Sequence, residues 1–184
     1  PGECLLCQRP VPADSDPLIC SLCRLRWPMV TPPWCSRCGQ PVDRDIECRL
    51  CLDWPVGFGT VRSAVWLTGS ARAAVHHLKY GGWHRTTEAM AVAMRTLTPL
   101  TGSPVLVPVP LGRARRRERG YNQCDHLASA IAGQTGGRVR FDLLERSRET
   151  ARQTGLHPDA RRSNTDGAFR ARRMAPGARL VLVD

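Results

Sequence analysis

The spacing of hydrophobic residues along the chain changes near residue 60. Beyond that point, short apolar runs alternate with segments in which apolar side chains recur every three or four positions. Runs of the first kind are typical of buried strands, and the second spacing is typical of amphipathic helices. Neither pattern persists in the first 55 residues, where prolines and cysteines separate a few large apolar side chains. The sequence therefore predicts two units, a small irregular module at 1–55 and an α/β domain at 56–184.

Five short apolar runs of the second unit are predicted to be strands. They lie at residues 61–67, 104–110, 138–144, 168–171 and 180–183. Prolines in the run 104–110 restrict which of its edges can accept a neighbouring strand. A turn is expected at Pro176-Gly177, before the last run.

Three segments with helical spacing lie between these strands. They occupy residues 70–80, 87–97 and 122–135, and a shorter helical turn is expected at 158–162. Ser70 and Asn122 are good N-caps, and glycine pairs follow the first and third helices. Cys124 falls on the buried side of the third helix, where a core role is favoured over a nucleophilic one. Alternating strands and helices predict an open parallel sheet with helices on both faces.

Eight of the nine cysteines lie in the first unit and form four Cys-x-x-Cys pairs. The pairs are Cys4 and Cys7, Cys20 and Cys23, Cys35 and Cys38, and Cys48 and Cys51. Two residues between the thiols let both approach one metal ion from a tight turn, and two such turns complete a tetrahedron. The pattern predicts two structural Zn²⁺ sites, on which the folding of this small unit depends.

Two alternatives to this arrangement are open at the level of sequence. Eight cysteines also suit a disulfide framework in an extracellular protein, but the chain shows no secretory signal pattern, which favours zinc. If zinc is bound, consecutive pairs give the simplest sites, whereas a cross-braced arrangement joins the first pair to the third with the same ligands. The near-zero charge of the unit does not distinguish a surface for nucleic acid from one for protein.

Basic charge is concentrated in the second unit. It contains 21 basic and 9 acidic side chains, whereas the first unit contains 6 and 7. Lys79 is the only lysine, so the excess is arginine, whose planar guanidinium pairs with phosphate through two hydrogen bonds. A coding bias explains the preference for arginine equally well, but it does not explain the uneven distribution. A phosphorylated partner is therefore expected for the second unit.

Five arginines gather between Leu111 and Asn122, directly after the predicted strand 104–110. A solvent-exposed arginine-rich loop is one explanation of this segment. Its ending, Gly120-Tyr121-Asn122, leads into a helix N-terminus, however, where backbone amides and the helix dipole favour anions. In open parallel sheets, ligands bind beyond the carboxyl ends of the strands, which is where this segment is expected. The segment is therefore a candidate anion-binding loop.

The overall composition excludes two classes of protein. Hydrophobic residues make up 42% and charged residues 23% of the chain, which is close to globular averages and excludes a mainly disordered chain. No run of about 18 apolar residues is present, and the first residues lack the basic-then-apolar pattern of a secretory signal. We therefore expect a cytoplasmic protein without a transmembrane segment.

Five motifs follow one another in the second unit. They are Leu78-Lys79-Tyr80-Gly81-Gly82, Val107-Pro108-Val109-Pro110, Arg119-Gly120-Tyr121-Asn122-Gln123, the spaced set Thr150, Gln153 and Leu156, and the spaced set Arg161, Asn164, Gly167, Ala168 and Phe169. In this order, and after two cysteine-rich ribbons, they resemble the ComF family of phosphoribosyltransferase-like proteins, which includes the GntX-type relatives. Each motif alone is weak, but their order is specific, and the resemblance covers essentially the whole chain.

The resemblance implies a phosphoribosyltransferase-like fold and a site for phosphoribosyl pyrophosphate (PRPP) with Mg²⁺. The substrate-binding residues that it implies are Lys79, Tyr80, Gly81, Gly82, Arg117, Arg119, Gly120, Tyr121, Asn122 and Asp184. Three of them take the catalytic roles. Lys79 lies in the pyrophosphate loop, Arg119 in a mobile lid over pyrophosphate, and Asp184 at the ribose hydroxyls.

One motif of the family is incomplete. It is expected to begin at Leu180 and to continue past Asp184 with a second acid and a Thr-Thr-Gly loop that holds the 5-phosphate. The resemblance therefore implies a truncated chain without transferase activity of its own; the alternative is a natural edge strand. The family is associated with DNA uptake, so the intact protein is expected to be a phosphoribosyltransferase with DNA-uptake partners. A non-catalytic zinc-ribbon protein that binds single-stranded DNA is the alternative function.

Overall fold

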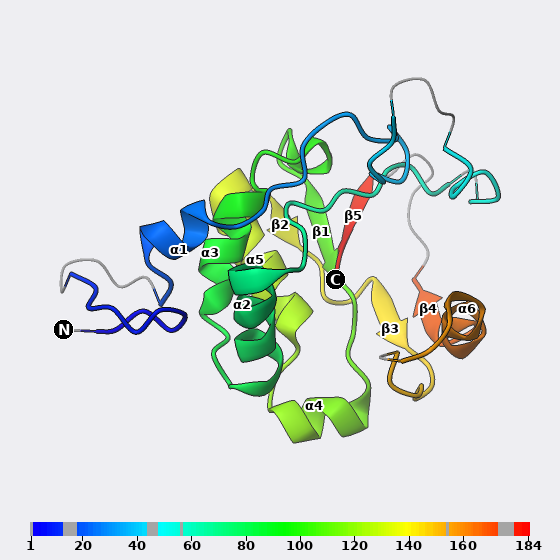
Figure 1. Cartoon of the computed structure of the whole chain (residues 1–184). Helices are drawn as coiled ribbons and strands as arrows, with labels where there is room; N and C mark the ends of the chain where they lie inside the picture. The colour runs from blue at the N-terminus through cyan, green and yellow to red at the C-terminus, as the bar shows by residue number, and fades with distance from the viewer. Residues whose placement is uncertain (1, 13–17, 44–47, 56, 154, 173–178) are drawn as a thin grey trace.

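The computed structural model describes residues 2–12, 18–43, 48–55, 57–153, 155–172 and 179–184. At its centre is a parallel sheet with the strand order β2-β1-β5 (Figure 1). The strands are β1 (Val105–Pro108), β2 (Arg138–Val139) and β5 (Leu180–Val183). Val105 pairs with Arg138 on one side and with Leu180 on the other. β1 is thus the central strand, as its continuous apolar sequence requires.

Three helices stack on one face of this sheet (Figure 1). They are α2 (Gly69–Tyr80), α3 (Thr86–Met94) and α5 (Gln123–Thr135). α5 packs on all three strands, α3 packs on α5, and α2 packs on α3. Leu106 and Ile131 are fully buried in the core that these layers form. The predicted parallel sheet is confirmed. The prediction of helices on both faces is not, because the described helices that pack on the sheet lie on one face, and Leu180 and Leu182 on the opposite face of β5 are exposed.

Smaller elements surround the core. They are α1 (Ser21–Leu25), the 3-10 helix η1 (Thr98–Leu100), α4 (Arg113–Arg119), α6 (Pro158–Thr165) and the antiparallel pair β3 (Leu144–Arg146) and β4 (Phe169–Ala171). Figure 1 shows β3, β4 and α6 on the side of the sheet away from α1, and α4 below the sheet and α2. The expected turn at Pro176-Gly177 lies outside the described residues. No helix in the described part of the chain is long and apolar enough to cross a bilayer.

The predicted strand at 61–67 is wrong. A single antiparallel bridge joins Val65 to Met29, and beside it the Trp66 amide donates to the Pro28 carbonyl at 2.8 Å. The backbone of this segment is therefore used to attach the cysteine-rich unit and not to extend the sheet. The apolar residues of this segment predicted burial, and this is correct for Ala64, which is buried at the contact.

Two other predictions from the apolar pattern differ in detail. The run 138–144 does not form one strand, because β2 ends at Val139 and Phe141 is exposed before β3 begins. Asn122 caps α5 as expected, since its side chain accepts a hydrogen bond from the Cys124 amide. Ser70, in contrast, lies inside α2, and Thr68 is at the N-cap position.

Part of the cysteine-rich unit shares the core of the α/β elements. Cys4, Ile19 and Trp27 are buried in one hydrophobic cluster with Ala74 and Leu78 of α2. The position of α1 next to the stacked helices in Figure 1 illustrates this contact. The rest of the unit, beyond residue 33, contributes no member to the cluster among the described residues. The two parts of the unit are therefore attached to the protein differently.

Candidate functional site

The eight cysteines of the first unit form two clusters in sequence order. The first contains Cys4, Cys7, Cys20 and Cys23, and the second contains Cys35, Cys38, Cys48 and Cys51. Within each cluster, all four sulfur atoms lie within 4.8 Å of one another, and none is in a disulfide. Consecutive pairs therefore share a site, and the cross-braced alternative is excluded. We refer to the described residues within 2–27 as ribbon 1 and to those within 34–58 as ribbon 2.

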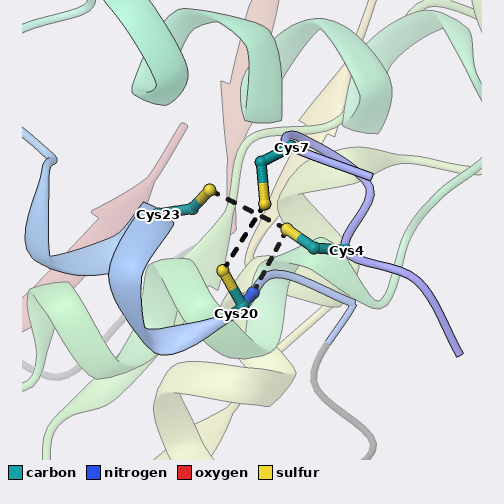
Figure 2. A group of neighbouring side chains, drawn as sticks. All are labelled: Cys4, Cys7, Cys20 and Cys23. Atoms are coloured by element: carbon teal, nitrogen blue, oxygen red, sulfur yellow. Dashed lines mark hydrogen bonds between the residues drawn. The ribbon is translucent and has the colours of Figure 1, made fainter. Parts of the chain in front are cut away.

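The sulfur positions match tetrahedral zinc sites. A Zn–S bond of about 2.3 Å places the corners of a tetrahedron about 3.8 Å apart. In ribbon 1, Cys4 Sγ lies 3.8 Å from Cys23 Sγ, and Cys7 Sγ lies 3.8 Å from Cys20 Sγ (Figure 2). The corresponding pairs in ribbon 2 are 3.7 and 3.5 Å apart. Each set therefore suits one structural Zn²⁺, with four protein ligands and no position left for a substrate.

One thiol in each ribbon favours the thiolate form. Burial raises the pKa of Cys4, but hydrogen bonds from backbone amides, first that of Cys20, outweigh burial and lower the pKa to about 6. Backbone amides, first that of Cys38, also lower the pKa of Cys35 to about 6. Burial and contacts with the other thiols raise the pKa of Cys23. A bound cation reverses this last effect, because it favours the thiolate form of every ligand.

Ribbon 2 is joined to the following segment through backbone contacts around Gly39. Gly39 has a φ of +71°, and a Cβ atom there would lie 2.6 Å from the carbonyl oxygen of Val61. The Val61 amide donates to the Arg37 carbonyl at 2.8 Å, and the Arg62 guanidinium donates to the Ser36 carbonyl at 2.7 Å. Glycine is required at this position, because other residues rarely adopt this φ and no side chain fits the close approach.

A second candidate site lies at the carboxyl ends of β1 and β5. A cavity of about 350 Å³ is present there. Its lining residues are Lys79, Tyr80, Gly82, Val109, Leu111, Arg115, Glu118, Arg119, Gln123, Arg152, Gln153 and Asp184. Val109 directly follows β1, and Asp184 directly follows β5. The cavity therefore occupies the edge of the sheet at which ligands bind in open parallel-sheet proteins.

The arginine-rich segment beside the cavity is a helix, α4, and not a loop. It ends at Gly120, which adopts a left-handed conformation with a φ of +84°. Positions three and four apart share one face of a helix, so Arg115, Glu118 and Arg119 face the cavity together. Arg117 lies on another face, is exposed and does not line the cavity.

The two cavity-facing arginines of α4 are held by neighbouring segments. The Arg115 guanidinium donates to the carbonyl oxygen of Thr150 at 2.9 Å and to its hydroxyl at 3.0 Å. The Arg119 guanidinium donates to the side-chain oxygen of Gln123 and lies 5.6 Å from the centre of the Tyr80 ring. Neither arginine forms an ion pair with a carboxylate of the described residues. Both are therefore available to an anion.

Lys79 reaches the cavity from the last turn of α2. The Tyr121 hydroxyl donates to the Leu78 carbonyl and so ties α2 to the chain after α4. Burial raises the pKa of Tyr121, which keeps the proton on this hydroxyl. Gly82 lines the cavity with a φ of +76°, whereas the Gly81 amide is used by the turn and Gly81 does not line the cavity. Lys79 also forms no ion pair within the described residues.

α5 orients the groups at the ends of the strands. The Asp184 carboxylate accepts a hydrogen bond from the Cys124 thiol at 3.4 Å. Burial raises the pKa of Cys124, so this residue is a buried donor and not a nucleophile. The Asn122 side chain, 2% exposed, donates to the Val109 carbonyl at 3.1 Å and to the Asp125 carboxylate at 2.7 Å. Asn122 thus joins α5 to the end of β1 and does not line the cavity.

The cavity gathers half of the substrate-binding residues expected from the sequence. Those that line it are Lys79, Tyr80, Gly82, Arg119 and Asp184, and those that do not are Gly81, Arg117, Gly120, Tyr121 and Asn122. The polar residues that line it without having been expected are Arg115, Glu118, Gln123, Arg152 and Gln153. The helical spacing of positions 115, 118 and 119 is the sequence signal that identifies part of this second group.

Comparison with known proteins gives matches over the whole chain. Residues 1–52 match a family described as a double zinc ribbon domain. The chain is 32% identical to the DNA utilization protein YhgH of Salmonella typhi and 28% identical to that of Escherichia coli K12. Each comparison covers 100% of this chain and 84% of the relative. No solved structure matches the chain.

Proposed function

This chain belongs to the ComF/GntX-type family of the DNA utilization protein YhgH, and on that premise we propose that it functions in DNA uptake. In this proposal the two ribbons are structural, and the cavity binds PRPP together with Mg²⁺ in a phosphoribosyltransferase-like site. The observation that carries the proposal is the convergence of Lys79, Arg115 and Arg119 on one cavity, without carboxylate partners among the described residues.

The charge and size of the cavity support an anionic ligand of this kind. Four cationic side chains and two carboxylates line it, and one of the carboxylates, Glu118, is already paired with Arg152. Pyrophosphate carries several negative charges on tetrahedral groups, which suit guanidinium and ammonium donors. The volume of about 350 Å³ lies within the range of about 300–1,000 Å³ that is usual for small-molecule sites.

The residues around the cavity take different roles in this proposal. Lys79 places a compact ammonium group, and Arg119 a planar guanidinium group, next to pyrophosphate. Asp184 accepts hydrogen bonds from the ribose hydroxyls or from water bound to the metal. Bound Mg²⁺ neutralises charge on the pyrophosphate group. Tyr121 and Asn122 are positioning residues, because one fixes the backbone before Lys79 and the other fixes the end of β1.

Equilibrium binding of PRPP to the zinc-loaded chain, with and without Mg²⁺, tests this proposal. Lys79→Gln and Arg119→Gln are each expected to weaken binding by about tenfold or more, because a charged hydrogen bond contributes about 1.5–3 kcal/mol. Arg117→Gln is the matched control, since it removes the same charge from the same helix but outside the cavity. It is expected to change the affinity less than twofold. A folded, zinc-loaded chain that binds neither PRPP nor inorganic pyrophosphate in the presence of Mg²⁺ contradicts the proposal, because Lys79 and Arg119 both line the cavity of this chain.

A second candidate function is binding of single-stranded DNA by the outer face of α4. Arg113, Arg116 and Arg117 are exposed there, and Arg116 has only a loose contact, 3.9 Å, with the Asp125 carboxylate. Relatives are named for DNA utilization, which favours a role with this polymer. Each arginine that neutralises a phosphate of a single strand contributes about −0.7 to the slope of log affinity against log salt.

Affinity for a single-stranded oligonucleotide at several salt concentrations separates this function from the first. The triple variant R113Q/R116Q/R117Q is expected to weaken binding and to reduce the salt slope by about 2. Arg115→Gln, on the cavity face, is the control and is expected to leave both quantities nearly unchanged. If Arg115→Gln weakens binding and the triple variant does not, DNA binds at the cavity and not at the outer face of α4.

A further inference from the structure

An ion pair joins two sides of the cavity. Glu118 comes from α4, Arg152 comes from the segment between β3 and α6, and both line the cavity. One terminal nitrogen of Arg152 donates to both carboxylate oxygens of Glu118, at 3.0 and 3.3 Å. The two side chains are 63% and 67% exposed. The pair is therefore accessible to solvent, and it uses only one nitrogen of the guanidinium among the described contacts.

We propose that Arg152 is a ligand-binding residue of the cavity and that Glu118 occupies it until a phosphate group of the ligand takes its place. This inference rests on the proposed function and extends it, because the sequence assigned a role to neither residue. In the absence of ligand, the carboxylate neutralises Arg152. When a phosphate binds, Arg152 leaves the carboxylate and becomes the fourth cation around the ligand, with Lys79, Arg115 and Arg119.

The geometry of the pair favours such an exchange. An exposed ion pair in high dielectric is among the weaker ionic contacts in proteins. A phosphate group carries more charge than a carboxylate, and it accepts two parallel hydrogen bonds from a guanidinium where Glu118 accepts from a single nitrogen. The carboxylate therefore lowers the affinity for the ligand without blocking it.

The segment that carries Arg152 stays at the cavity when the pair opens. Two residues earlier, the Thr150 hydroxyl accepts hydrogen bonds from Arg115 of α4 at 3.0 Å and from Arg146 of β3 at 2.5 Å. Arg146 also donates to the Pro110 carbonyl at 3.2 Å, beyond the end of β1. Arg115 also donates to the Thr150 backbone carbonyl at 2.9 Å, so the backbone of the segment is held independently of Glu118 and only side chains have to move.

Binding of inorganic pyrophosphate to the full, zinc-loaded chain, measured by calorimetry without Mg²⁺, tests the proposal. Glu118→Gln is expected to tighten binding about three- to fivefold, because the competing charge is removed. Arg152→Gln is expected to weaken it about fivefold. The double variant is expected to bind like Arg152→Gln alone, because removing Glu118 then frees no cation. A purely structural role for the pair would not produce this pattern.

Glu88→Gln is the matched control, since Glu88 is also exposed and paired with an arginine, 3.5 Å away, but does not line the cavity. It is expected to change the affinity less than twofold. The proposal is overturned if the wild type binds pyrophosphate and Glu118→Gln binds it equally or more weakly, with or without Mg²⁺. It is also overturned if the gain from Glu118→Gln persists without Arg152. If neither the wild type nor any variant binds pyrophosphate or PRPP, with Mg²⁺ as well as without it, the proposed function fails and this inference fails with it.

Discussion

Ribbon 1 and ribbon 2 carry the same ligands in the same Cys-x-x-Cys pairs, but only ribbon 1 is part of the main core. Cys4 and Cys23 are 1% and 6% exposed, and they lie in one cluster with Trp27 and residues of α2, α3 and α5. Cys51 of ribbon 2 is buried as well, but it lies outside that cluster. A metal ion held by ribbon 1 would therefore organise part of the main core, whereas one held by ribbon 2 would organise ribbon 2 alone.

The difference arises from the residues between the ligands and not from the ligands themselves. Between its two pairs, ribbon 1 has Val11 and Ile19, which are buried against the helices. Between its two pairs, ribbon 2 has Val42 among the described residues, which is only half-buried and lies outside the cluster. Four thiolates at the right spacing are sufficient for a metal site, but the neighbouring apolar side chains decide what that site supports.

The largest expected effect separates the two ribbons directly. Cys4→Ser removes a metal ligand from ribbon 1. The folding free energy of ribbon 1 is then expected to lose the contribution of metal binding, on the order of 10 kcal/mol. Because Cys4 lies in the shared core, the amides of α2 and α5 are expected to lose protection from hydrogen exchange as well. Cys35→Ser is expected to unfold ribbon 2 alone. Hydrogen exchange with mass spectrometry, together with zinc content per chain, measures both; equal protection of α5 in the two variants contradicts the distinction.

A smaller effect is expected from one tryptophan in each ribbon. Trp27→Ala is expected to lower the free energy of unfolding by about 3–5 kcal/mol, because a buried side chain is removed from the shared core. Trp54 is half-buried and packs edge-on against Phe58, with ring centres 5.1 Å apart. Trp54→Ala is expected to change the global stability by less than about 1 kcal/mol. Chemical denaturation of zinc-saturated protein measures both values, and similar losses would show that the ribbons unfold together.

This contrast also defines what could be predicted from the sequence. The spacing of the cysteines predicted four half-sites and two clusters, because local chain geometry brings the two thiols of each Cys-x-x-Cys pair together, but it left open which pairs combine. The apolar pattern predicted β1, α5 and the Asn122 cap, which likewise depend on neighbouring residues. The burial of Ile19 and Trp27 against α2 was not predicted, since their partners lie far along the chain and local patterns carry no record of them.

The cavity illustrates the same limit. The segment after β1 was expected to be a loop, although arginine, alanine and glutamate are good helix formers. In the helix α4, the periodicity of about 3.6 residues per turn places Arg115 and Arg119 on the face toward the cavity and Arg117 on another face. Arg152, in contrast, reaches the cavity through the tertiary contacts of Thr150, which no local pattern could indicate. Helical periodicity is thus sufficient for Arg115 and Arg119, the motif resemblance indicated Lys79, and only Arg152 required the fold.

Removal of zinc by a chelator is expected to occur in two phases of equal amplitude. A ligand cluster must open before it loses its metal, and opening ribbon 1 exposes the shared core, whereas opening ribbon 2 does not. Ribbon 1 is therefore expected to release its ion at least about tenfold more slowly than ribbon 2. A metallochromic chelator follows the release, and Cys35→Ser is expected to abolish the fast phase. A single phase that releases both ions would contradict the difference between the ribbons.

The smallest expected effect concerns the contact that attaches ribbon 2. Gly39→Ala places a Cβ atom 2.6 Å from the Val61 carbonyl at a φ of +71°, which costs about 1–2 kcal/mol. The strain weakens the neighbouring hydrogen bond between the Val61 amide and the Arg37 carbonyl, so the fast phase of zinc release is expected to accelerate about fivefold.

The slow phase of the Gly39→Ala variant is expected to be unchanged, because ribbon 1 makes no use of this contact. Gly57→Ala is the control within ribbon 2, since a Cβ atom there meets no heavy atom within 4 Å, and neither phase is expected to change. If Gly39→Ala accelerates both phases, the strain reaches ribbon 1 through the segment 61–67, which contacts ribbon 2 at Arg37 and residues 28–30 directly after ribbon 1. The two ribbons then open as one unit, and the shared core does not distinguish them.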